Sequence, residues 1–310
     1  MHKKSYSEKI EILLTHYKFS TKLAEALRVH RMSIQNWRKD SQNISKENRF
    51  NIDMLFAQHY IVPRLSKSIV QERVNRLSKE NHKPFITNID IILEVSRKNA
   101  FGSLEVEIDD ASEVLFYRVL DNDFIEKDMN KRKFLEMSNL AFLTNQMMTD
   151  TIEGYIETID SRLIKKWHFG LMSGIRSDAG HYSTKMRIIP DTHIALTLPE
   201  DIPEEIEYWV SRYTDVNTIF DIASAHEHFE LIHPFGDGNG RIGRLIMAQQ
   251  FISNGMLPPL IDGQNKALYY ITLEEAQTKG NILPLVYFLI EAVDRMKEKL
   301  GIERYFKDAK

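Results

Sequence analysis

The sequence predicts a mainly α-helical protein, with a small helical domain in front of a larger helical body. Apolar residues recur at helical spacing through most of the chain, as at Leu23, Leu27 and Ile34. Alternation with period two, which is typical of strands, is confined to short stretches. With 310 residues, the chain is long enough for one large domain or two unequal ones.

The composition restricts the classes of protein and of chemistry. The chain contains no cysteine, which excludes disulfides and a thiol nucleophile and fits a reducing compartment. No apolar run approaches the roughly 20 residues that a membrane-spanning helix needs, and the N-terminus lacks the apolar core of a signal peptide. We therefore expect a soluble, cytoplasmic protein.

The first fifty residues are basic although the whole chain is acidic. They contain eleven Lys and Arg against five Asp and Glu, a net charge of +6, whereas the full chain carries −3. A first amphipathic helix is marked by Ile10, Leu13 and Leu14. This split in charge indicates a basic module attached to an acidic body.

Residues 20–37 of this module have the spacing of a helix-turn-helix and resemble that of phage-repressor-like regulators. Ala24 is small where the two helices would cross, and Ser33 is a candidate N-cap of the second helix. Arg28 departs from the pattern, because such turns usually carry Gly. The positions expected to bury a core are Leu23, Leu27, Val29, Ile34 and Trp37; those expected to face DNA are Gln35, Asn36, Arg38 and Lys39. A helical protein–protein module with a solvated basic face is the alternative.

The segments that follow predict further helices. Residues 45–61 would close the small domain, 66–81 would form a connecting helix, and 89–95 another. Residues 104–108 alternate with period two and predict a short strand. We divide the chain into a helix-turn-helix-like domain (1–65), a mostly helical connecting region (66–125) and a larger helical domain (126–300).

The stretch from His233 to Arg244, HPFGDGNGRIGR, has the composition of an anion-binding site. Its glycines let backbone N–H groups approach a ligand without a Cβ in the way. The apolar residues that follow predict a helix, and a helix N-terminus favours phosphate. Arg241 and Arg244 share a face of that helix and can hold further phosphate oxygens.

Two more residues of this stretch fit nucleotide phosphate chemistry. Asp237 is a lone carboxylate among phosphate-binding groups, which makes sense chiefly as a Mg²⁺ ligand. His233 is the only nearby group whose pKa suits proton removal at neutral pH. The stretch is not a Walker A loop, because it lacks the Gly-Lys-Ser/Thr ending.

The stretch matches the signature of the Fic family, HPFx(D/E)GNGRxxR, at every specified position. The chain resembles Fic proteins over about residues 134–293. The resemblance implies a helical core with a small β-hairpin flap, and an enzyme that moves AMP from ATP to a hydroxyl of a target protein, with Mg²⁺.

The resemblance also implies roles for individual residues. His233 would act as the general base, and Asp237 would hold Mg²⁺. Phe235 would anchor the loop to the core. The phosphate-binding residues would be Gly238, Asn239, Gly240, Arg241 and Arg244. A Lys in place of Gly240 would resemble the phosphorylating relatives of the family, so AMP transfer is the expected reaction.

A second motif upstream resembles the inhibitory pattern of the same family, (S/T)xxxE(G/N). It comprises Thr149, Glu153 and Gly154, with the first two on one face of a predicted helix. The resemblance implies that Glu153 points into the nucleotide site and pairs with Arg244. ATP would then lose one of its phosphate contacts.

Residues 178–189 resemble the Fic flap, a hairpin that holds an incoming target segment as an added strand. Residues 193–198 would form its second half, and Tyr182, Ser183 and Arg187 lie on or near it. Closer to the C-terminus, Tyr269 or Tyr270 would pack near the adenine, and Gln277 would contact the nucleoside. Helix spacing argues against zinc at His226 and His228, because positions i and i+2 diverge by about 200°.

Three alternatives to AMP transfer remain open from the sequence. The same site could remove AMP from a modified protein, or could transfer another phosphate-containing group such as UMP or phosphocholine. The third alternative is a DNA-binding regulator whose body only senses a nucleotide. The sequence also leaves open the target protein and whether the chain forms a homo-oligomer.

Overall fold

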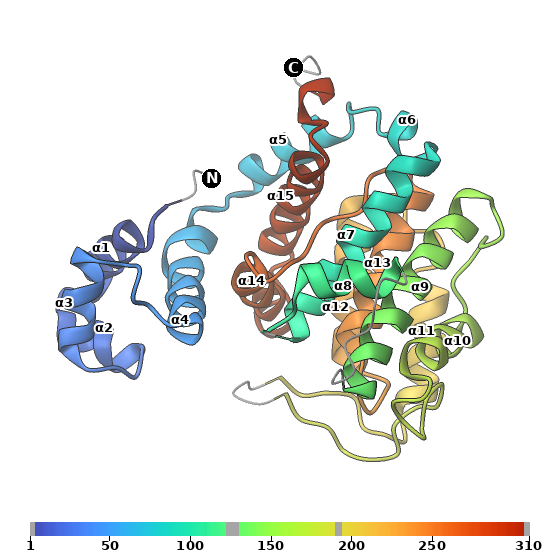
Figure 1. The fold of residues 1–310 in the computed structure, drawn as a ribbon, viewed down its shortest axis with the longest axis horizontal. Helices are drawn as coiled ribbons and strands as arrows, with labels where there is room; N and C mark the ends of the chain where they lie inside the picture. Colours follow the sequence, from blue (N-terminus) through green and yellow to red (C-terminus); the bar gives the residue numbers. More distant parts are fainter. Residues whose placement is uncertain (1–3, 109, 122–129, 190–193, 307–310) are drawn as a thin grey trace.

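The computed structural model describes residues 4–108, 110–121, 130–189 and 194–306. Helices account for nearly all of the regular structure in these ranges (Figure 1). In chain order they are α1 (Tyr6–Tyr17), α2 (Ser20–Ala26), α3 (Arg31–Lys39), α4 (Lys46–Phe56), the π-helix η1 (Ala57–Ile61), the 3₁₀ helix η2 (Val62–Arg64), α5 (Lys67–Leu77), α6 (Lys83–Ile86), α7 (Ile89–Glu107), α8 (Glu113–Leu120), α9 (Lys131–Ile152), α10 (Ser161–Met172), α11 (Ile202–Arg212), α12 (Ile219–Ile232), α13 (Asn239–Ser253), α14 (Lys266–Lys279), α15 (Leu283–Leu300) and the 3₁₀ helix η3 (Glu303–Phe306).

The four N-terminal helices share an apolar core of their own. Buried residues of this core are Ile10, Leu13, Leu23, Ala24, Leu27, Ile34, Trp37, Ile44 and Ile52, with Val29 half-buried against them. Arg28 adopts a left-handed backbone (φ 54°) in the turn after α2, the conformation that glycine usually supplies. The cap expected at Ser33 is wrong, because α3 begins at Arg31 and the His30 ring accepts the Met32 N–H instead.

A second, smaller apolar cluster joins these helices to the rest of the molecule. It contains Phe56, Ala57, Ile61 and Val62 from α4, η1 and η2, together with Ile271 of α14. Figure 1 shows α4 between the N-terminal helices and α14. The N-terminal helices are therefore seated on α14 through the end of α4 and the π-helix.

In the larger helical part of the molecule, α13 is buried on nearly all sides. A helix that is covered all round must lie inside a larger assembly of helices. Helices α12, α9, α10 and α7 all contact it. Gly102 of α7 allows a close approach to the chain after α13, since a Cβ there would lie 2.6 Å from the Ile261 carbonyl oxygen. The last turns of α7 are thereby packed against the segment between α13 and α14.

The expected strand at 104–108 is wrong, because these residues form the last turn of α7. The period-two alternation of apolar and acidic residues there reflects a helix end: Leu104 and Val106 are buried, and Ile108 closes the turn by donating to the Leu104 carbonyl.

The expected β-hairpin flap is also corrected. Within residues 178–189 and 194–198 no strand is present; His193 lies outside the described residues. The described residues of the two arms form no β-ladder, although the Arg187 side chain donates to the Thr197 carbonyl. Instead the Ser183 N–H donates to the Pro234 carbonyl and the Thr197 N–H to the Leu231 carbonyl, so both arms lie along the chain that leads into the loop after α12. Among the described helices, none is long and apolar enough to cross a membrane.

Candidate active site

The loop between α12 and α13 is shaped by two left-handed residues. His233 ends α12 in the αL conformation (φ 50°, ψ 56°), and Gly238 (φ 81°) precedes the first residue of α13. A non-glycine residue in this region is strained and persists only where its surroundings enforce it. The Phe229 carbonyl does so by accepting the His233 N–H at 3.0 Å. The imidazole is thereby presented at the entrance of the glycine loop.

Asn239 braces the loop from inside. Its side-chain oxygen accepts the Phe235 N–H and its nitrogen donates to the Phe235 carbonyl, both at 2.8 Å. Both polar atoms of this side chain thus bond within the loop, and the phosphate contact expected for its second amide N–H stays a prediction. The backbone N–H groups at the start of α13 are left as the anion-binding groups of the loop.

His168 of α10 is a loop-supporting residue that the sequence did not reveal. Its ring stacks on Phe235, with 3.7 Å between ring centroids, and Phe235 is fully buried as expected. The Gly180 N–H donates to His168 Nδ1, and Nε2 lies 3.0 Å from the Asp237 carbonyl oxygen. Burial lowers the pKa of His168 to about 4. A neutral ring that accepts at one nitrogen and donates at the other thus ties the loop to α10.

His233 is half-buried and suited to accept a proton. Burial lowers its pKa below the usual range, against an opposite effect of the Glu230 carbonyl. Nδ1 lies 3.4 Å from that carbonyl oxygen, which favours the tautomer with the proton on Nδ1. In that tautomer Nε2 is unprotonated and free to take a proton at neutral pH.

Asp237 is the loop carboxylate, and it lies among arginines. Oδ1 accepts from the Gly238 N–H at 2.7 Å and from Arg241 at 3.2 Å, while Arg132 is 3.6 Å from Oδ2. Groups of three or more metal-ligating side chains are absent from the part of the chain that the structure describes. A single carboxylate fits Mg²⁺ nonetheless, because this ion is usually held by one or two carboxylates together with substrate phosphates and water.

Arg244 is buried, with 4% of its surface exposed, and its guanidinium group donates three hydrogen bonds to α7. Nε donates to the Ser103 hydroxyl at 2.9 Å, and Nη2 donates to the Ser103 carbonyl and, at 2.7 Å, to Glu107 Oε1. Burial acts to raise the pKa of Glu107, but the charge and hydrogen bond of Arg244, together with the charges of Arg241 and His233, lower it. Glu107 is therefore ionised, and 37% of its side chain stays exposed at the mouth of the site.

The expected pair between Glu153 and Arg244 is wrong. Glu153 is exposed at the C-cap of α9, where its N–H donates to the Thr149 carbonyl. Gly154 follows in the left-handed region (φ 79°) with nothing near its absent Cβ, and Tyr155 N–H donates back to the Asp150 carbonyl. This is the Schellman end of a helix. The Glu-Gly pair that suggested an inhibitory motif is a helix stop.

Ser103 and Glu107 repeat the spacing of that motif, with a hydroxyl residue four positions before a glutamate. Ile108 stands where the pattern has Gly or Asn. The sequence signal for the true partner of Arg244 was thus present, and the strand expected at 104–108 concealed it.

A buried polar cluster lies behind Arg244. Glu230 of α12 is buried, its Oε1 has no hydrogen-bond partner in the described structure, and a Cβ on Gly243 would approach that oxygen to 2.3 Å. Burial raises the pKa of Glu230 to about 7; Arg244 opposes this effect and Glu107 adds to it. His226, one turn earlier on α12, lies 2.8 Å from the Tyr269 hydroxyl, and burial lowers its pKa to about 3.

The residues expected on the flap lie close to the loop. Tyr182 packs on Phe235, with 5.7 Å between ring centroids, and its hydroxyl is buried. Ser183 bonds to the Pro234 carbonyl through its N–H, and its hydroxyl donates to the Lys185 carbonyl. Arg187 donates to the Thr197 carbonyl at 2.9 Å and is near enough to His233 to lower the pKa of that ring.

The residues expected to contact the nucleoside lie on two faces of α14. Tyr269 points into the core toward His226, whereas Tyr270 is half-buried and its hydroxyl lies 3.4 Å from the Val106 carbonyl oxygen. Gln277 is half-buried, two turns after Tyr270 on the same face. These positions bring Tyr270 to the end of α7; the described structure contains no nucleoside contact for any of the three.

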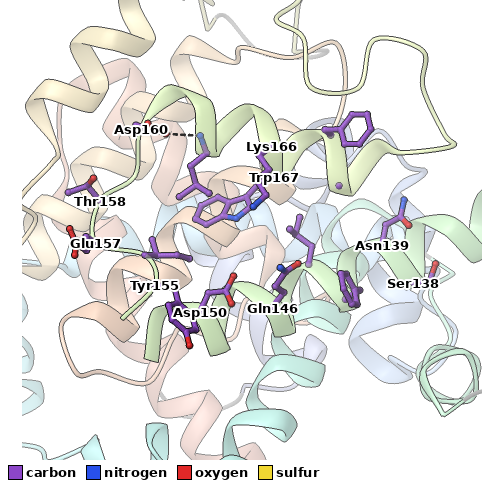
Figure 2. A pocket seen from close by; sticks show the side chains of 16 residues that line it. Ser138, Asn139, Gln146, Asp150, Tyr155, Glu157, Thr158, Asp160, Lys166 and Trp167 are labelled. Atoms are coloured by element: carbon purple, nitrogen blue, oxygen red, sulfur yellow. Dashed lines mark hydrogen bonds between the residues drawn. The ribbon is translucent and has the colours of Figure 1, made fainter. Parts of the chain in front are cut away.

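A cavity lies elsewhere, between α9, α10 and the segment that joins them (Figure 2). Its volume is 880 Å³. Lys166 and Gly170 of α10 line it, and both lie about 200° around the helix from His168. This cavity is therefore separate from the loop that bears His233.

Comparisons with known proteins agree with this geometry. Residues 158–251 match the Fic/DOC family. Protein adenylyltransferase Fic of Aedes aegypti is 40% identical over 73 residues, which are 24% of this chain and 14% of that protein. A probable protein adenylyltransferase of Aquifex aeolicus is 26% identical over 161 residues, 50% of this chain and 49% of that protein. The chain thus spans at most about half the length of these relatives.

Solved structures share the fold. Fic-1 from C. elegans superposes with a TM-score of 0.65 at 16% identity, over 89% of this chain and 93% of the other. A Fic family protein from Desulfovibrio desulfuricans G20 gives 0.62 at 20% identity, over 78% and 77%. The protein therefore contains a helical domain in which a Fic-type loop precedes a buried helix. Residues 158–251 of the chain therefore form a Fic/DOC domain.

Replacing Glu230 by Gln should change how stability depends on pH. The folded pKa of about 7 exceeds the unfolded value of 4.5, so the carboxyl group favours folding below pH 4.5 and this contribution is lost as the pH rises through 7. Between pH 5 and 8 the free energy of unfolding of the wild type should fall by up to about 3 kcal/mol, and that of Glu230→Gln should not show this fall. Urea unfolding of both proteins at the two pH values measures this. Equal losses in both proteins would contradict it.

Proposed function

We propose that the chain transfers AMP from ATP to a hydroxyl group of a target protein. The observation that carries the proposal is the joint placement of three features at one loop: the imidazole of His233, the free N–H groups at the start of α13, and Arg244. The names of the relatives support the same activity, although each aligns over only part of its length.

In the proposed reaction His233 takes the proton of the target hydroxyl as the oxygen attacks the α-phosphorus of ATP. A new bond forms between that oxygen and the α-phosphorus, the bond between the α-phosphorus and the α–β bridging oxygen breaks, and pyrophosphate leaves. Gly238 and Gly240 keep the loop free of side chains, so that its N–H groups can hold the phosphates. Mg²⁺ would be held by Asp237 and, when bound, would neutralise phosphate charge.

Glu107 is proposed to keep this site inactive. Arg244 can hold the terminal phosphates of ATP only when its guanidinium is free, and Glu107 occupies it. A carboxylate at this position also repels the triphosphate directly. The inhibitory role expected for Glu153 is thus transferred to a residue on α7, and Ser103 assists by accepting from the same arginine.

A second proposal concerns the N-terminal helices, which would bind duplex DNA. The side chains of Asn36 and Lys39 are exposed on α3, and the segment carries a net charge of +6. Arg38 is also exposed, but it is paired with Glu11 at 2.6 Å. The exposed basic face of α3 supports this proposal.

The first test uses ATP labelled at either end. Label at the α-phosphate should appear on protein, label at the γ-phosphate should not, and His233→Ala should lower transfer roughly 10²–10⁴-fold because the general base is lost. Circular dichroism should show an unchanged helical fold in this variant. Labelling from the γ-phosphate alone would indicate a kinase and contradict the proposal.

The second test replaces each glutamate in turn. Glu107→Gly should raise self-labelling tenfold or more, because a charge-assisted hydrogen bond of roughly 1.5–3 kcal/mol no longer restrains Arg244. Glu153→Gly is the matched control and should behave like the wild type. Arg244→Ala in the Glu107→Gly background should remove the gain. Activation by Glu153→Gly alone would refute the assignment of inhibition to α7.

The third test is a gel shift with the full chain and genomic duplex fragments. Affinity should fall steeply as salt is raised, because phosphate neutralisation releases counterions. Asn36→Ala combined with Lys39→Ala should weaken binding, whereas Lys299→Ala on α15 should not. An absence of any complex at low salt would favour a protein-binding module.

A further inference from the structure

The N-terminal helices reach the inhibitory end of α7 through one residue of α14. Phe50 of α4 meets the Tyr270 ring edge-on, with 6.2 Å between centroids and 80° between planes. Lys266 Nζ lies over the Phe50 ring, 5.3 Å from the ring centroid. Phe50 and Tyr270 are both half-buried, so this ring pair is part of the junction between the N-terminal helices and the body.

Tyr270 in turn contacts the last turn of α7. Its hydroxyl lies 3.4 Å from the Val106 carbonyl oxygen. The last four carbonyl groups of a helix have no partner within the helix, so an outside donor helps to fix the position of that turn. At 3.4 Å the bond is longer than the usual 2.5–3.0 Å, which makes it weak. The contact therefore helps to position the last turn of α7 but restrains it only weakly.

A second contact from α4 ends at the same place. Lys46, the first residue of α4, forms an ion pair of 2.9 Å with Asp110, three residues beyond Glu107. Both side chains are largely exposed, and such pairs contribute little to stability. The pair nevertheless places the beginning of α4 beside the chain that leaves α7.

The position of Glu107 is set by the last turn of α7 more directly than that of any earlier residue of the helix. It is the last residue of the helix, and the backbone leaves the helical conformation at Ile108. Gly102 and Ser103 are anchored one turn earlier, by the close approach to Ile261 and by Arg244. The contacts of Tyr270 and Lys46 therefore fall on the part of α7 that carries the inhibitory carboxylate.

We propose that the N-terminal helices act as a clamp on the inhibitory end of α7, with Tyr270 as the positioning residue that holds Glu107 against Arg244. This inference rests on the inhibitory role of Glu107 proposed above. Seating of α4 on α14 then favours the blocked site, and displacement of α4 favours the open one.

Linkage makes the clamp reciprocal. If seated N-terminal helices lower the affinity for ATP, bound ATP must loosen their seat by the same factor. A macromolecule that binds the N-terminal helices and draws α4 away from α14 would then activate the nucleotide site without touching it.

The test measures ATP affinity by calorimetry in the full chain, with His233→Ala present throughout so that no nucleotide is consumed. Phe50→Ala and Tyr270→Phe should each raise affinity roughly 2- to 10-fold, the range expected from one aromatic ring pair or one weak hydrogen bond. In the Glu107→Gly background neither change should have a further effect, because the restraint is already gone. Self-labelling without His233→Ala should follow the same pattern.

Matched controls separate the clamp from a general loss of packing. Phe19→Ala removes an exposed ring of the N-terminal helices, and Tyr305→Phe removes an exposed hydroxyl far along the chain; neither should alter ATP affinity. Thermal melting identifies a variant that fails to fold. Tyr270→Phe removes only a hydroxyl group, so this variant should fold and allow ATP affinity to be measured.

The outcomes are distinct. Unchanged affinity in both Phe50→Ala and Tyr270→Phe overturns the clamp. An equal change with and without Glu107 also overturns it, since Tyr270 would then act on the nucleotide directly. If Glu107→Gly binds ATP more tightly yet transfers no label, the proposed reaction fails while the clamp is still decided by the binding data. If Glu107→Gly binds ATP no more tightly than the protein with Glu107, both the inhibitory role of Glu107 and the clamp are contradicted.

Discussion

The ion pair between Arg244 and Glu107 is the interaction on which the arrangement of the site depends. Arg244 projects from a helix that is covered on nearly all sides, and an unpaired charge in such a place costs several kcal/mol. Ser103 and Glu107, both on α7, accept hydrogen bonds from it. The end of α7 must therefore lie beside the loop, and Gly240 leaves room for the pair, since a Cβ there would come within 2.8 Å of Glu107. The contact that makes the buried arginine tolerable is also the contact that ATP would have to replace.

The loop could be predicted from the sequence because its geometry is local. His233, the glycines and Arg241 act within a dozen residues, and short-range rules on glycine, helix termini and charge apply to them directly. The local pattern does not reveal, however, that the side chain of Asn239 bonds within the loop. Asn239 has the chemistry of a phosphate ligand, but its side chain bonds to a backbone four residues earlier. His168 was missed because it supports the loop from a separate helix and shares its face with apolar residues.

The partner of Arg244 could not be obtained in this way. Glu107 lies 137 residues before it, and only the tertiary fold brings the two together. Several segments have a hydroxyl residue four positions before a glutamate, and Gly154 favoured the one at Thr149, which does not contact Arg244. That glycine is explained by the end of α9, where a left-handed residue is needed. The alternation at 104–108 was ambiguous for a similar reason: five residues are too few to distinguish a strand from the last turn of a helix.

Arg244 is flanked by two carboxyl groups in unlike environments, and this explains how one arginine can serve two states. Glu107 is partly exposed and ionised, whereas Glu230 is buried with a pKa near 7 that the charge of Glu107 helps to raise. Around neutral pH the guanidinium therefore faces one full negative charge on the side of the mouth, while the carboxyl group behind it is held close to neutral. A triphosphate that displaced Glu107 would bring at least as much negative charge to the same side and would keep Glu230 protonated by the same Coulomb effect. The buried side of the site would then need no rearrangement, and the exchange of carboxylate for phosphate would be confined to the end of α7.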